Sequence, residues 1–325
     1  MSLSGAFGSA IATWLAAHGG AGGRRQASAA LSATYRAGGG SQSIDLASYL
    51  VARLPATYAA VSRVLEELRK RRPGFHPLSL LDAGSGPGTA SWAAAGLWPS
   101  LSAVTFLDNS PSFLALAREL AKGGPEPLAS AAAVAGTILA LPAGVAADLV
   151  VAAYALAELP LARAAAAAEG LWASSRSVLV LVEPGTPHGF ARIRAARDTL
   201  LAQGAVPVAP CPHALGCPIA GEDWCHFSVR LARSRAHLHA KGALVPFEDE
   251  RYAYLILARE GDPTGGARIL APPEHAKPGS SFRLCTHGST EIRYIARRSG
   301  AAYKLAKKLG WGDLMAPEKQ EEEGS

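Results

Sequence analysis

Three of the four cysteines in this chain fall within fifteen residues, in the stretch CPHALGCPIAGEDWC at positions 211–225. The fourth, Cys285, is separated from Cys225 by 59 residues. Thiolate is a soft ligand, and four thiolates form a closed site for zinc or for an iron–sulfur cluster. We therefore predict that Cys211, Cys217, Cys225 and Cys285 bind a metal. The alternatives are buried cysteines that bind nothing and, less favoured in a reducing compartment, a disulfide.

The spacing of these cysteines, C-x5-C-x7-C, lacks the C-x2-C pairs that are typical of zinc ribbons. Prolines directly follow Cys211 and Cys217, a feature shared with many iron–sulfur ligand loops. The spacing favours an iron–sulfur cluster slightly, and zinc stays the alternative. Three histidines flank the thiols, and we expect them around the ligands or at the surface rather than on the metal. They are His213, His226 and His287.

A second group of residues with chemical potential is the glycine-rich stretch LLDAGSGPG at positions 80–88. Glycines let the backbone turn tightly and let a ligand approach where a Cβ would clash. The spacing is G-x-G-x-G rather than the dinucleotide fingerprint G-x-G-x-x-G, and an acid precedes it. A carboxylate there would repel a pyrophosphate but suits the amino group of a methionine moiety. The stretch TFLDNS then supplies an acid that can accept hydrogen bonds from ribose hydroxyls. The predicted cofactor-binding residues are Asp82, Gly84, Gly86, Gly88, Asp108 and Asn109.

These residues, in this order, resemble the class I S-adenosylmethionine-dependent methyltransferases over about residues 75–200. The resemblance implies that the glycine loop binds the methionine end of the cofactor and that Asp108 binds its ribose. It favours an enzyme that methylates RNA, with a binding-only protein as the alternative.

No catalytic residue stands out after the fourth predicted strand. Methyltransferases that act on base amines commonly carry Asn/Asp-Pro-Pro-aromatic there, whereas this chain has AAYAL at 152–156. Tyr154 could stack on a base, but no polar group is present to orient an amine. Carbon-5 pyrimidine methylation needs a cysteine nucleophile, and the first cysteine comes only at Cys211. Glu158 and Glu183 receive no catalytic role, so the catalytic residue is unknown.

Short apolar stretches alternate with helical ones from residue 78 onward, which predicts βαβ units and a parallel sheet. The predicted fold is α/β: a class I methyltransferase (Rossmann-like) sheet with an N-terminal helical segment, interrupted at Pro55, and a C-terminal metal-binding, basic extension. We place the N-terminal helical region at residues 1–74 and the S-adenosylmethionine-binding core at 75–205. The cysteine-cluster and basic region follows at 206–315, and a disordered acidic tail at 316–325.

The composition is that of a folded globular chain with an ample core, since 49% of its 325 residues are hydrophobic and 18% are charged. No apolar run reaches the roughly 20 residues of a membrane span. The net charge of +6 leans toward polyanionic partners. Residues 289–310 carry six basic residues against the single acid Glu291, with interleaved aromatics, a mixture that suits RNA.

A narrower resemblance rests on YRAGG, ARLPATYAAV, LLDAGSGPGTA, LVEPGTPHGF, the cysteine stretch, LCTHG and KKLGWGD, across about residues 29–313. Together they resemble the small-ribosomal-subunit-associated methyltransferase-like family, known from mitochondrial assembly proteins with bacterial members. The resemblance implies a [4Fe–4S] cluster on Cys211, Cys217, Cys225 and Cys285. It also implies binding to the small ribosomal subunit and its rRNA, rather than to DNA or a membrane. We expect a cytoplasmic protein, with the mitochondrial matrix as the alternative.

Overall fold

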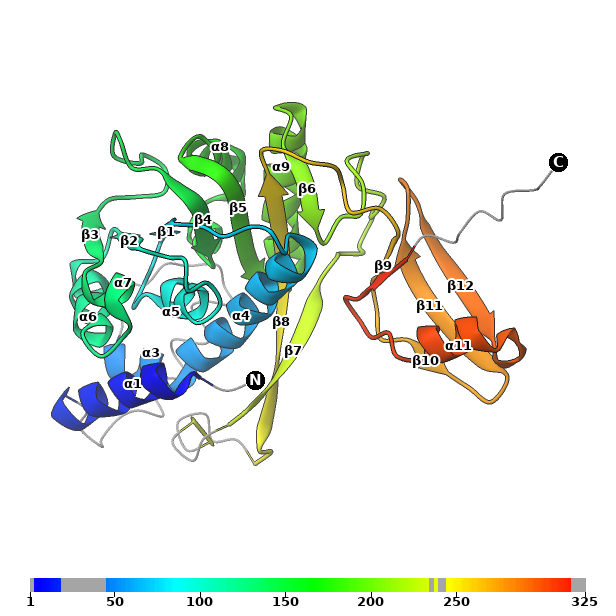
Figure 1. The fold of residues 1–325 in the computed structure, drawn as a ribbon, viewed down its shortest axis with the longest axis horizontal. Coiled ribbons are helices and arrows are strands. Elements are labelled where there is room, and N and C mark those ends of the chain that lie inside the picture. The colour runs from blue at the N-terminus through cyan, green and yellow to red at the C-terminus, as the bar shows by residue number, and fades with distance from the viewer. Residues whose placement is uncertain (1–2, 19–44, 234–236, 239–243, 317–325) are drawn as a thin grey trace.

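The computed structural model describes residues 3–18, 45–233, 237–238 and 244–316. A large mixed sheet with helices on both faces forms most of it, and a smaller antiparallel sheet lies to one side (Figure 1). The predicted acidic tail, apart from Ala316, and residues 19–44 of the predicted N-terminal helical region lie outside the described residues. In the described part of the chain, no helix has both the length and the apolar character that a bilayer span requires.

The large sheet has the strand order β3-β2-β1-β4-β5-β8-β6, with β7 also paired to β8. Strands β1 to β5 are parallel, while β8 runs antiparallel to β5, β6 and β7. The order 3-2-1-4-5 is that of a doubly wound Rossmann-like sheet. The predicted methyltransferase-type α/β fold is therefore confirmed. The strands are β1 (Ser79–Ala83), β2 (Ala103–Asp108), β3 (Ala132–Ala135), β4 (Ala147–Ala153), β5 (Ser175–Pro184), β6 (Val206–Ala209), β7 (Phe227–Ala232) and β8 (Phe247–Ala258).

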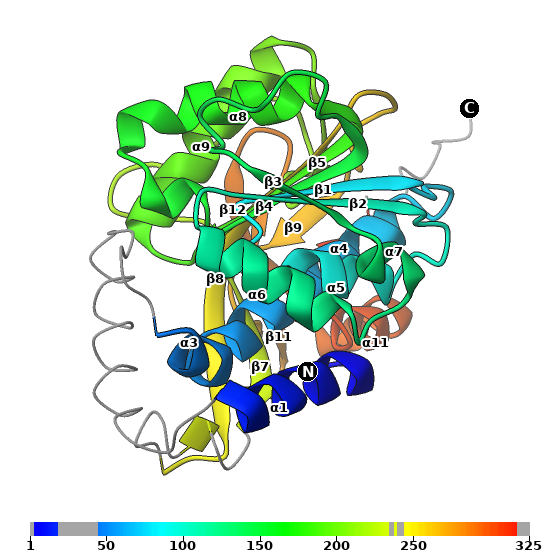
Figure 2. The ribbon, with the colours of Figure 1, turned by 90° about the vertical axis from the view of Figure 1, so that its left-hand side faces the viewer.

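Helices cover both faces of this sheet, as the edge-on view in Figure 2 shows. Helices α4, α5 and α6 contact one face, and α8 and α9 contact the other. Strands β4 and β5 are buried along almost their whole length, which explains why they appear in the sequence as continuous apolar runs. The helices are α1 (Gly5–His18), α3 (Leu46–Ala52), α4 (Leu54–Arg71), α5 (Thr89–Ala95), α6 (Pro111–Ala121), α7 (Glu126–Ala129), α8 (Ala164–Ala173), α9 (Pro187–Ala202) and α11 (Ala301–Ala306), with 3-10 turns η1 (Leu156–Glu158), η2 (Leu161–Arg163) and η3 (Arg297–Ser299).

The predicted interruption of the N-terminal helical segment lies at Arg53, between α3 and α4. Pro55 stands in the first turn of α4, where its missing N–H removes no intrahelical hydrogen bond. The break bends the chain, so that α4 crosses the sheet and contacts β7 and β8.

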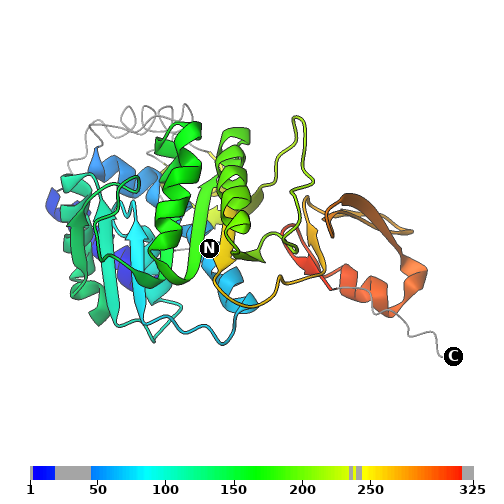
Figure 3. The ribbon, with the colours of Figure 1, turned by 90° about the horizontal axis from the view of Figure 1, so that it is seen from above.

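The smaller sheet is antiparallel and has its own apolar cluster, which includes Ile269, Phe282 and Leu284. Figure 3 shows it beside the large sheet, beyond β6. Its strands are β9 (Ala267–Ile269), β10 (Glu274–His275), β11 (Gly279–Cys285), β12 (Thr290–Ala296) and β13 (Leu314–Met315). The large sheet continues past residue 205, where the predicted core ends, because β6, β7 and β8 all belong to it. The predicted division into regions stays a proposal.

Candidate functional site

The loops that follow β1, β2, β3 and β4 surround a pocket of about 560 Å³. It lies at the carboxyl ends of the parallel strands, where the strand order reverses between β1 and β4, and this is where doubly wound sheets bind ligands. Its volume is in the range of small-molecule and cofactor sites. We call it the cofactor pocket; its lining residues are Tyr49, Arg53, Thr57, Gly84, Gly86, Asp108–Phe113, Gly136–Ile138, Ala153–Ala155, Glu158 and Leu159.

The glycine loop forms one wall of the cofactor pocket. Gly84 and Gly86 line it with φ angles of 72° and 51°, which favour glycine. A Cβ on Gly84 would lie 2.7 Å from the Cβ of Ala155, so a side chain there would push the β4 loop away. Gly88 does not line the pocket. It precedes α5 with φ 81°, and its Cβ would lie 3.0 Å from the ring of Phe106.

Asp108 connects the glycine loop to the end of β2. Its Oδ2 accepts a hydrogen bond from the Gly86 amide at 2.7 Å, and its Oδ1 accepts one from the Ser110 amide at 2.8 Å. Burial raises the pKa of this carboxyl, although the hydrogen bonds from Ser110 and Gly86 oppose the rise. Each carboxylate oxygen can accept a further hydrogen bond. Asp108 and Asn109 both line the pocket, as a ribose-binding role requires.

Asp82 lies behind the glycine loop and is not among the residues that line the pocket. Its side chain is 1% exposed, and its Oδ2 accepts hydrogen bonds from the amide and the hydroxyl of Ser91, at 2.9 and 2.8 Å. Burial raises the pKa of Asp82 to about 7, against the lowering effect of the Ser91 hydrogen bonds. The predicted contact of Asp82 with a methionine amino group stays a prediction.

Sequence reasoning missed the wall contributed by α3 and α4. Arg53 lies with its guanidinium carbon 4.6 Å from the centroid of the Tyr154 ring and forms an ion pair of 3.2 Å with Glu250. The Tyr154 hydroxyl donates to the same carboxylate at 2.8 Å. Tyr154 has a positive φ of 61°, which no local sequence signal predicts for a bulky residue. Arg53 covers one face of the ring and Tyr154 is only 6% exposed, so the base stacking predicted for Tyr154 stays a prediction.

Two glutamates lie around the segment that follows β4. Glu158 lines the cofactor pocket, and burial together with the charge of Asp108 raises its pKa. Glu183 is fully buried at the end of β5, and its Oε1 accepts a hydrogen bond of 2.9 Å from the Leu156 amide. Burial raises the pKa of Glu183 to about 8. Glu183 thus holds η1 in place without touching the pocket.

The four cysteines come together in a second, smaller pocket, which we call the thiol pocket. Cys211, Cys217 and Cys225 come from the loop between β6 and β7, and Cys285 ends β11 of the smaller sheet. All four are free thiols, and all four line the pocket. Burial raises the pKa of Cys211 and Cys225, and that of Cys285 to about 12. Within the described ranges, no group of three or more His, Cys, Asp or Glu side chains is placed to hold a single metal ion.

Two buried arginines also line the thiol pocket. Arg197 of α9 donates from Nε to the Sγ of Cys211 at 3.2 Å, and Arg268 of β9 enters from the smaller sheet. Their positive charges lower the pKa of Cys211 and Cys285, against the effect of burial. His213 also lines the pocket, with Nε2 3.6 Å from the Sγ of Cys285. Thiols, guanidinium groups and an imidazole suit a ligand that is held by thiolates and carries net negative charge.

The other two histidines contact aromatic rings. His226 stacks on Trp224 and contacts the edge of Trp311, and the His287 ring lies 6.1 Å from that of His213. Neither lines the thiol pocket.

A family model described as "Mitochondrial small ribosomal subunit Rsm22" matches residues 43–316, which include both pockets. The chain belongs to the Rsm22 family. The family resemblance expected from the sequence motifs is thereby confirmed, and the cysteines of the thiol pocket lie within the matched range.

Individual relatives are similar to this chain as well. The human protein named "Ribosome assembly protein METTL17, mitochondrial" is 34% identical over 291 residues, which cover 82% of this chain and 61% of that protein. "Rsm22-cox11 tandem protein 2, mitochondrial" of Schizosaccharomyces pombe is 25% identical over 324 residues, which cover 82% of this chain and 42% of that one. This Rsm22-family chain therefore spans less than two thirds of the length of either relative.

Solved structures to which the chain is similar include two that are named methyltransferases. Magnesium protoporphyrin IX methyltransferase from Synechocystis, with bound S-adenosylmethionine, has a TM-score of 0.41 and 16% identity, covering 72% of this chain and 97% of that one. A putative RNA methyltransferase from Pyrococcus horikoshii has a TM-score of 0.41 and 13% identity, covering 61% and 80%.

Proposed function

We propose that this Rsm22-family chain is a ribosome assembly protein that binds S-adenosylmethionine in the cofactor pocket and a [4Fe–4S] cluster in the thiol pocket, and that it contacts the RNA of the small ribosomal subunit. The observation that carries the proposal is that two sets of residues, distant in sequence, converge on these two pockets within the range that the family model matches. The names of the family and of the human relative support the ribosomal partner.

S-adenosylmethionine binding is supported by the residues of the cofactor pocket. Gly84 and Gly86 leave the backbone open to a ligand, and Asp108 presents carboxylate oxygens to hydroxyl groups beside them. We propose that Asn109 assists Asp108, and that Asp82 and Gly88 act through the shape of the loop. The cofactor would supply an activated methyl group.

Cluster binding is supported by the content of the thiol pocket. Four thiols, with no acidic side chain among the lining residues, give a soft donor set of the kind that iron–sulfur clusters use. Cys211, Cys217, Cys225 and Cys285 would hold the cluster. Because three of these residues belong to the β6–β7 loop and the fourth to β11, the cluster would cross-link the two sheets and stabilise the loop. Zinc remains the alternative occupant, and metal analysis would distinguish it from an iron–sulfur cluster.

RNA binding is supported by basic residues, most of them exposed, of β12, η3, α11 and the turn after α11, which we call the basic face. Arg293 is paired with Glu291 at 2.6 Å, but the other members form no ion pair with any described residue. Tyr294, at 53% exposed, lies among them and offers a ring for stacking. Trp311 does not contribute, because it packs against His226. The unpaired members are Arg297, Arg298, Lys304, Lys307 and Lys308.

Methyl transfer to rRNA is the second candidate function, and the position of Glu158 favours it. This carboxylate lines the cofactor pocket with a raised pKa, as a general base requires. The AAYAL segment itself contains no acidic or amide side chain, and the hydroxyl of its Tyr154 is already hydrogen-bonded to Glu250. Glu158 would accept a proton from the nucleophilic group of the substrate.

The names of the relatives support one of the two expected compartments. Both the family description and the two named relatives are mitochondrial, which supports the mitochondrial alternative rather than the cytoplasm expected from the sequence. We therefore propose a mitochondrial matrix location for a chain of this family, to be checked by localising a tagged chain in its own cells.

The test of the proposed function begins with iron and acid-labile sulfide analysis of protein purified without oxygen. About four irons and four sulfides per chain are expected. One zinc and no sulfide would instead exclude the proposed cluster. Calorimetric titration with S-adenosylmethionine follows, on the parent, on Asp108→Ala and on the control Ser102→Ala. We expect only Asp108→Ala to weaken binding, by about ten- to a hundred-fold, since a charged hydrogen-bond acceptor is lost.

Methyl transfer is measured separately, with labelled S-adenosylmethionine and small-subunit RNA. Label in the RNA that disappears in Glu158→Gln would establish the second candidate function. Cofactor binding without any label in the RNA would indicate an assembly protein that binds S-adenosylmethionine but does not methylate the RNA.

A further inference from the structure

Arg268 is buried where the thiol pocket meets the joint between the two sheets. Its side chain is 1% exposed, and three of its contacts come from different parts of the chain. Nε donates to the carbonyl of Pro210 at 2.7 Å, just before the cysteine loop. Nη1 donates to Glu67 of α4 at 2.8 Å and to the carbonyl of Gly312 at 2.7 Å. One guanidinium therefore joins α4, the cysteine loop and the segment before β13.

The remaining nitrogen of this guanidinium, Nη2, is buried and has no hydrogen-bond partner among the described residues. A buried N–H without an acceptor is costly, by about 1–3 kcal/mol for a neutral group and more for a charged one. Arg268 lines the thiol pocket, together with all four cysteines. The unused donor is thus available to an acceptor that the protein itself does not provide.

The charges around the thiol pocket do not balance when its thiols are protonated. Glu67 is the carboxylate that faces Arg268, but it also accepts from Nε of Arg71 at 2.7 Å. Arg197, on the other side, is 3% exposed, and its partner Asp198 is half exposed. Solvent screens that second pair, so Asp198 compensates only a small part of the positive charge of Arg197. Two buried guanidinium groups therefore give the pocket a net positive potential.

A [4Fe–4S] core on four thiolates carries net negative charge, which is expensive to bury without compensation. We propose that Arg197 and Arg268 are the cationic partners of the cluster: they neutralise its charge and donate hydrogen bonds to its sulfur atoms. This inference rests on the proposed cluster. Both residues are positioning residues, and neither is a ligand. Hydrogen bonds to sulfur and nearby positive charge are recognised ways in which a protein raises the reduction potential of a cluster.

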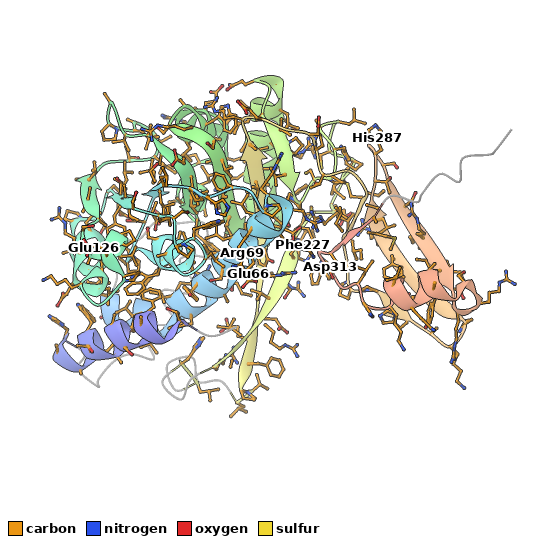
Figure 4. All side chains as sticks on the ribbon, in the orientation of Figure 1. Glu66, Arg69, Glu126, Phe227, His287 and Asp313 are labelled. Atoms are coloured by element: carbon orange, nitrogen blue, oxygen red, sulfur yellow. The ribbon has the colours of Figure 1, made fainter. Side chains whose placement is uncertain are left out.

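Arg268 also stabilises the joint between the two sheets, through the hydrogen bonds that its Nε and Nη1 donate. Figure 4 shows Phe227 and Asp313 at this joint, where Asp313 also lies 3.8 Å from Arg63 of α4. The same guanidinium that would face the cluster anchors the Gly312 carbonyl beside them. Loss of the cluster would therefore leave a buried charged donor unpaired at the contact between α4 and the smaller sheet.

The experiment compares the parent with Arg197→Gln, Arg268→Met and Arg268→Lys, all purified without oxygen. Arg283→Gln is the matched control, because Arg283 lies on β11 beside the cysteine loop and pairs with Asp223, yet its side chain is 42% exposed and does not line the thiol pocket. The readouts are iron and sulfide per chain, the midpoint potential of the cluster, and the rate at which a chelator removes its iron. S-adenosylmethionine affinity reports whether the large sheet remains folded.

We expect Arg197→Gln and Arg268→Met to keep iron and sulfide on purification, to shift the midpoint potential downward and to lose iron to the chelator several-fold faster. Arg268→Lys should restore part of the potential, since it keeps the charge without the planar fork. Arg283→Gln should match the parent. A cluster whose potential and chelation rate are unchanged in both arginine variants would overturn the inference while leaving the proposed function intact. Absence of iron and sulfide from the parent would overturn both.

If Arg268→Met fails to fold, which a loss of S-adenosylmethionine affinity would reveal, Arg197→Gln decides the question. Within the described part of the chain, the hydrogen bonds of Arg197 reach α9 and the cysteine loop and none reaches α4, so we expect its substitution to leave the joint intact. An unchanged potential in Arg197→Gln then counts against the inference.

Discussion

The amide of Gly86 donates a hydrogen bond of 2.7 Å to the carboxylate of Asp108. These two residues stand out in the sequence for separate reasons, as a loop glycine and as a predicted ribose-binding acid. Their contact means that the end of β2 sets the position of the loop after β1. Any ligand in the cofactor pocket therefore meets the two motifs as one surface.

Gly84→Ala should damage the cofactor pocket. Its φ of 72° strains an alanine, and the new Cβ would lie 2.7 Å from that of Ala155. We expect a loss of about 1–3 kcal/mol in the free energy of unfolding and at least about tenfold weaker S-adenosylmethionine binding. Gly74→Ala is the control, because no atom lies within 4 Å of its Cβ. Chemical denaturation and calorimetry check both, and equal behaviour of the two variants would contradict the role given to Gly84.

Cys217→Ser should remove the cluster, because three thiolates and a hydroxyl no longer close the site. The β6–β7 loop and β11 would lose their cross-link, and the smaller sheet should be destabilised more than the large one. Iron analysis and limited proteolysis near residue 220 measure this. Glu222→Gln, exposed on the same loop, is the control. Unchanged iron and an unchanged cleavage pattern in Cys217→Ser would disprove the assignment.

Glu183 should make the stability of the protein depend on pH. Burial raises the pKa of its carboxyl from 4.5 to about 8, so between these values the folded state holds a proton that the unfolded chain has lost. The free energy of unfolding should therefore fall as pH rises through this window, by up to about 1.4 kcal/mol per pH unit.

Glu183→Gln removes this proton and keeps an oxygen to accept from the Leu156 amide. Its stability relative to the parent should rise between pH 5 and pH 8, as urea unfolding at the two values would show. Glu126→Gln, at an exposed position, should not change the profile. Parallel pH profiles for Glu183→Gln and the parent would refute the prediction.

The basic face should bind RNA through phosphate contacts. If Lys307 and Lys308 each meet one phosphate, replacing both with Gln should lower the slope of log affinity against log salt by about 1.4–1.8. Filter binding to small-subunit RNA at several salt concentrations measures the slope. Lys122→Gln, exposed at the end of α6, should leave it unchanged. If the double substitution leaves the slope unchanged, RNA does not bind at Lys307 and Lys308, which would contradict the prediction.

The sequence by itself determined much of the large sheet, and it pointed to residues of both pockets, although Asp82 and Gly88 do not line the cofactor pocket. Apolar runs at β1, β2, β4 and β5 could be recognised because these strands are buried on both faces, so burial leaves a continuous local pattern. Gly84 and Asp108 could be recognised because a tight turn and a strand end constrain the residue types at single positions.

Only the tertiary structure decided how distant segments meet. The bond between Arg268 and Glu67 joins residues 201 positions apart, and nothing in the local pattern around either one predicts it. The sheet likewise continues past residue 205, because β8 inserts between β5 and β6. Pairing between remote strands and compensation of buried charge depend on which surfaces pack together. The periodicity of residue types along the chain does not encode which surfaces those are.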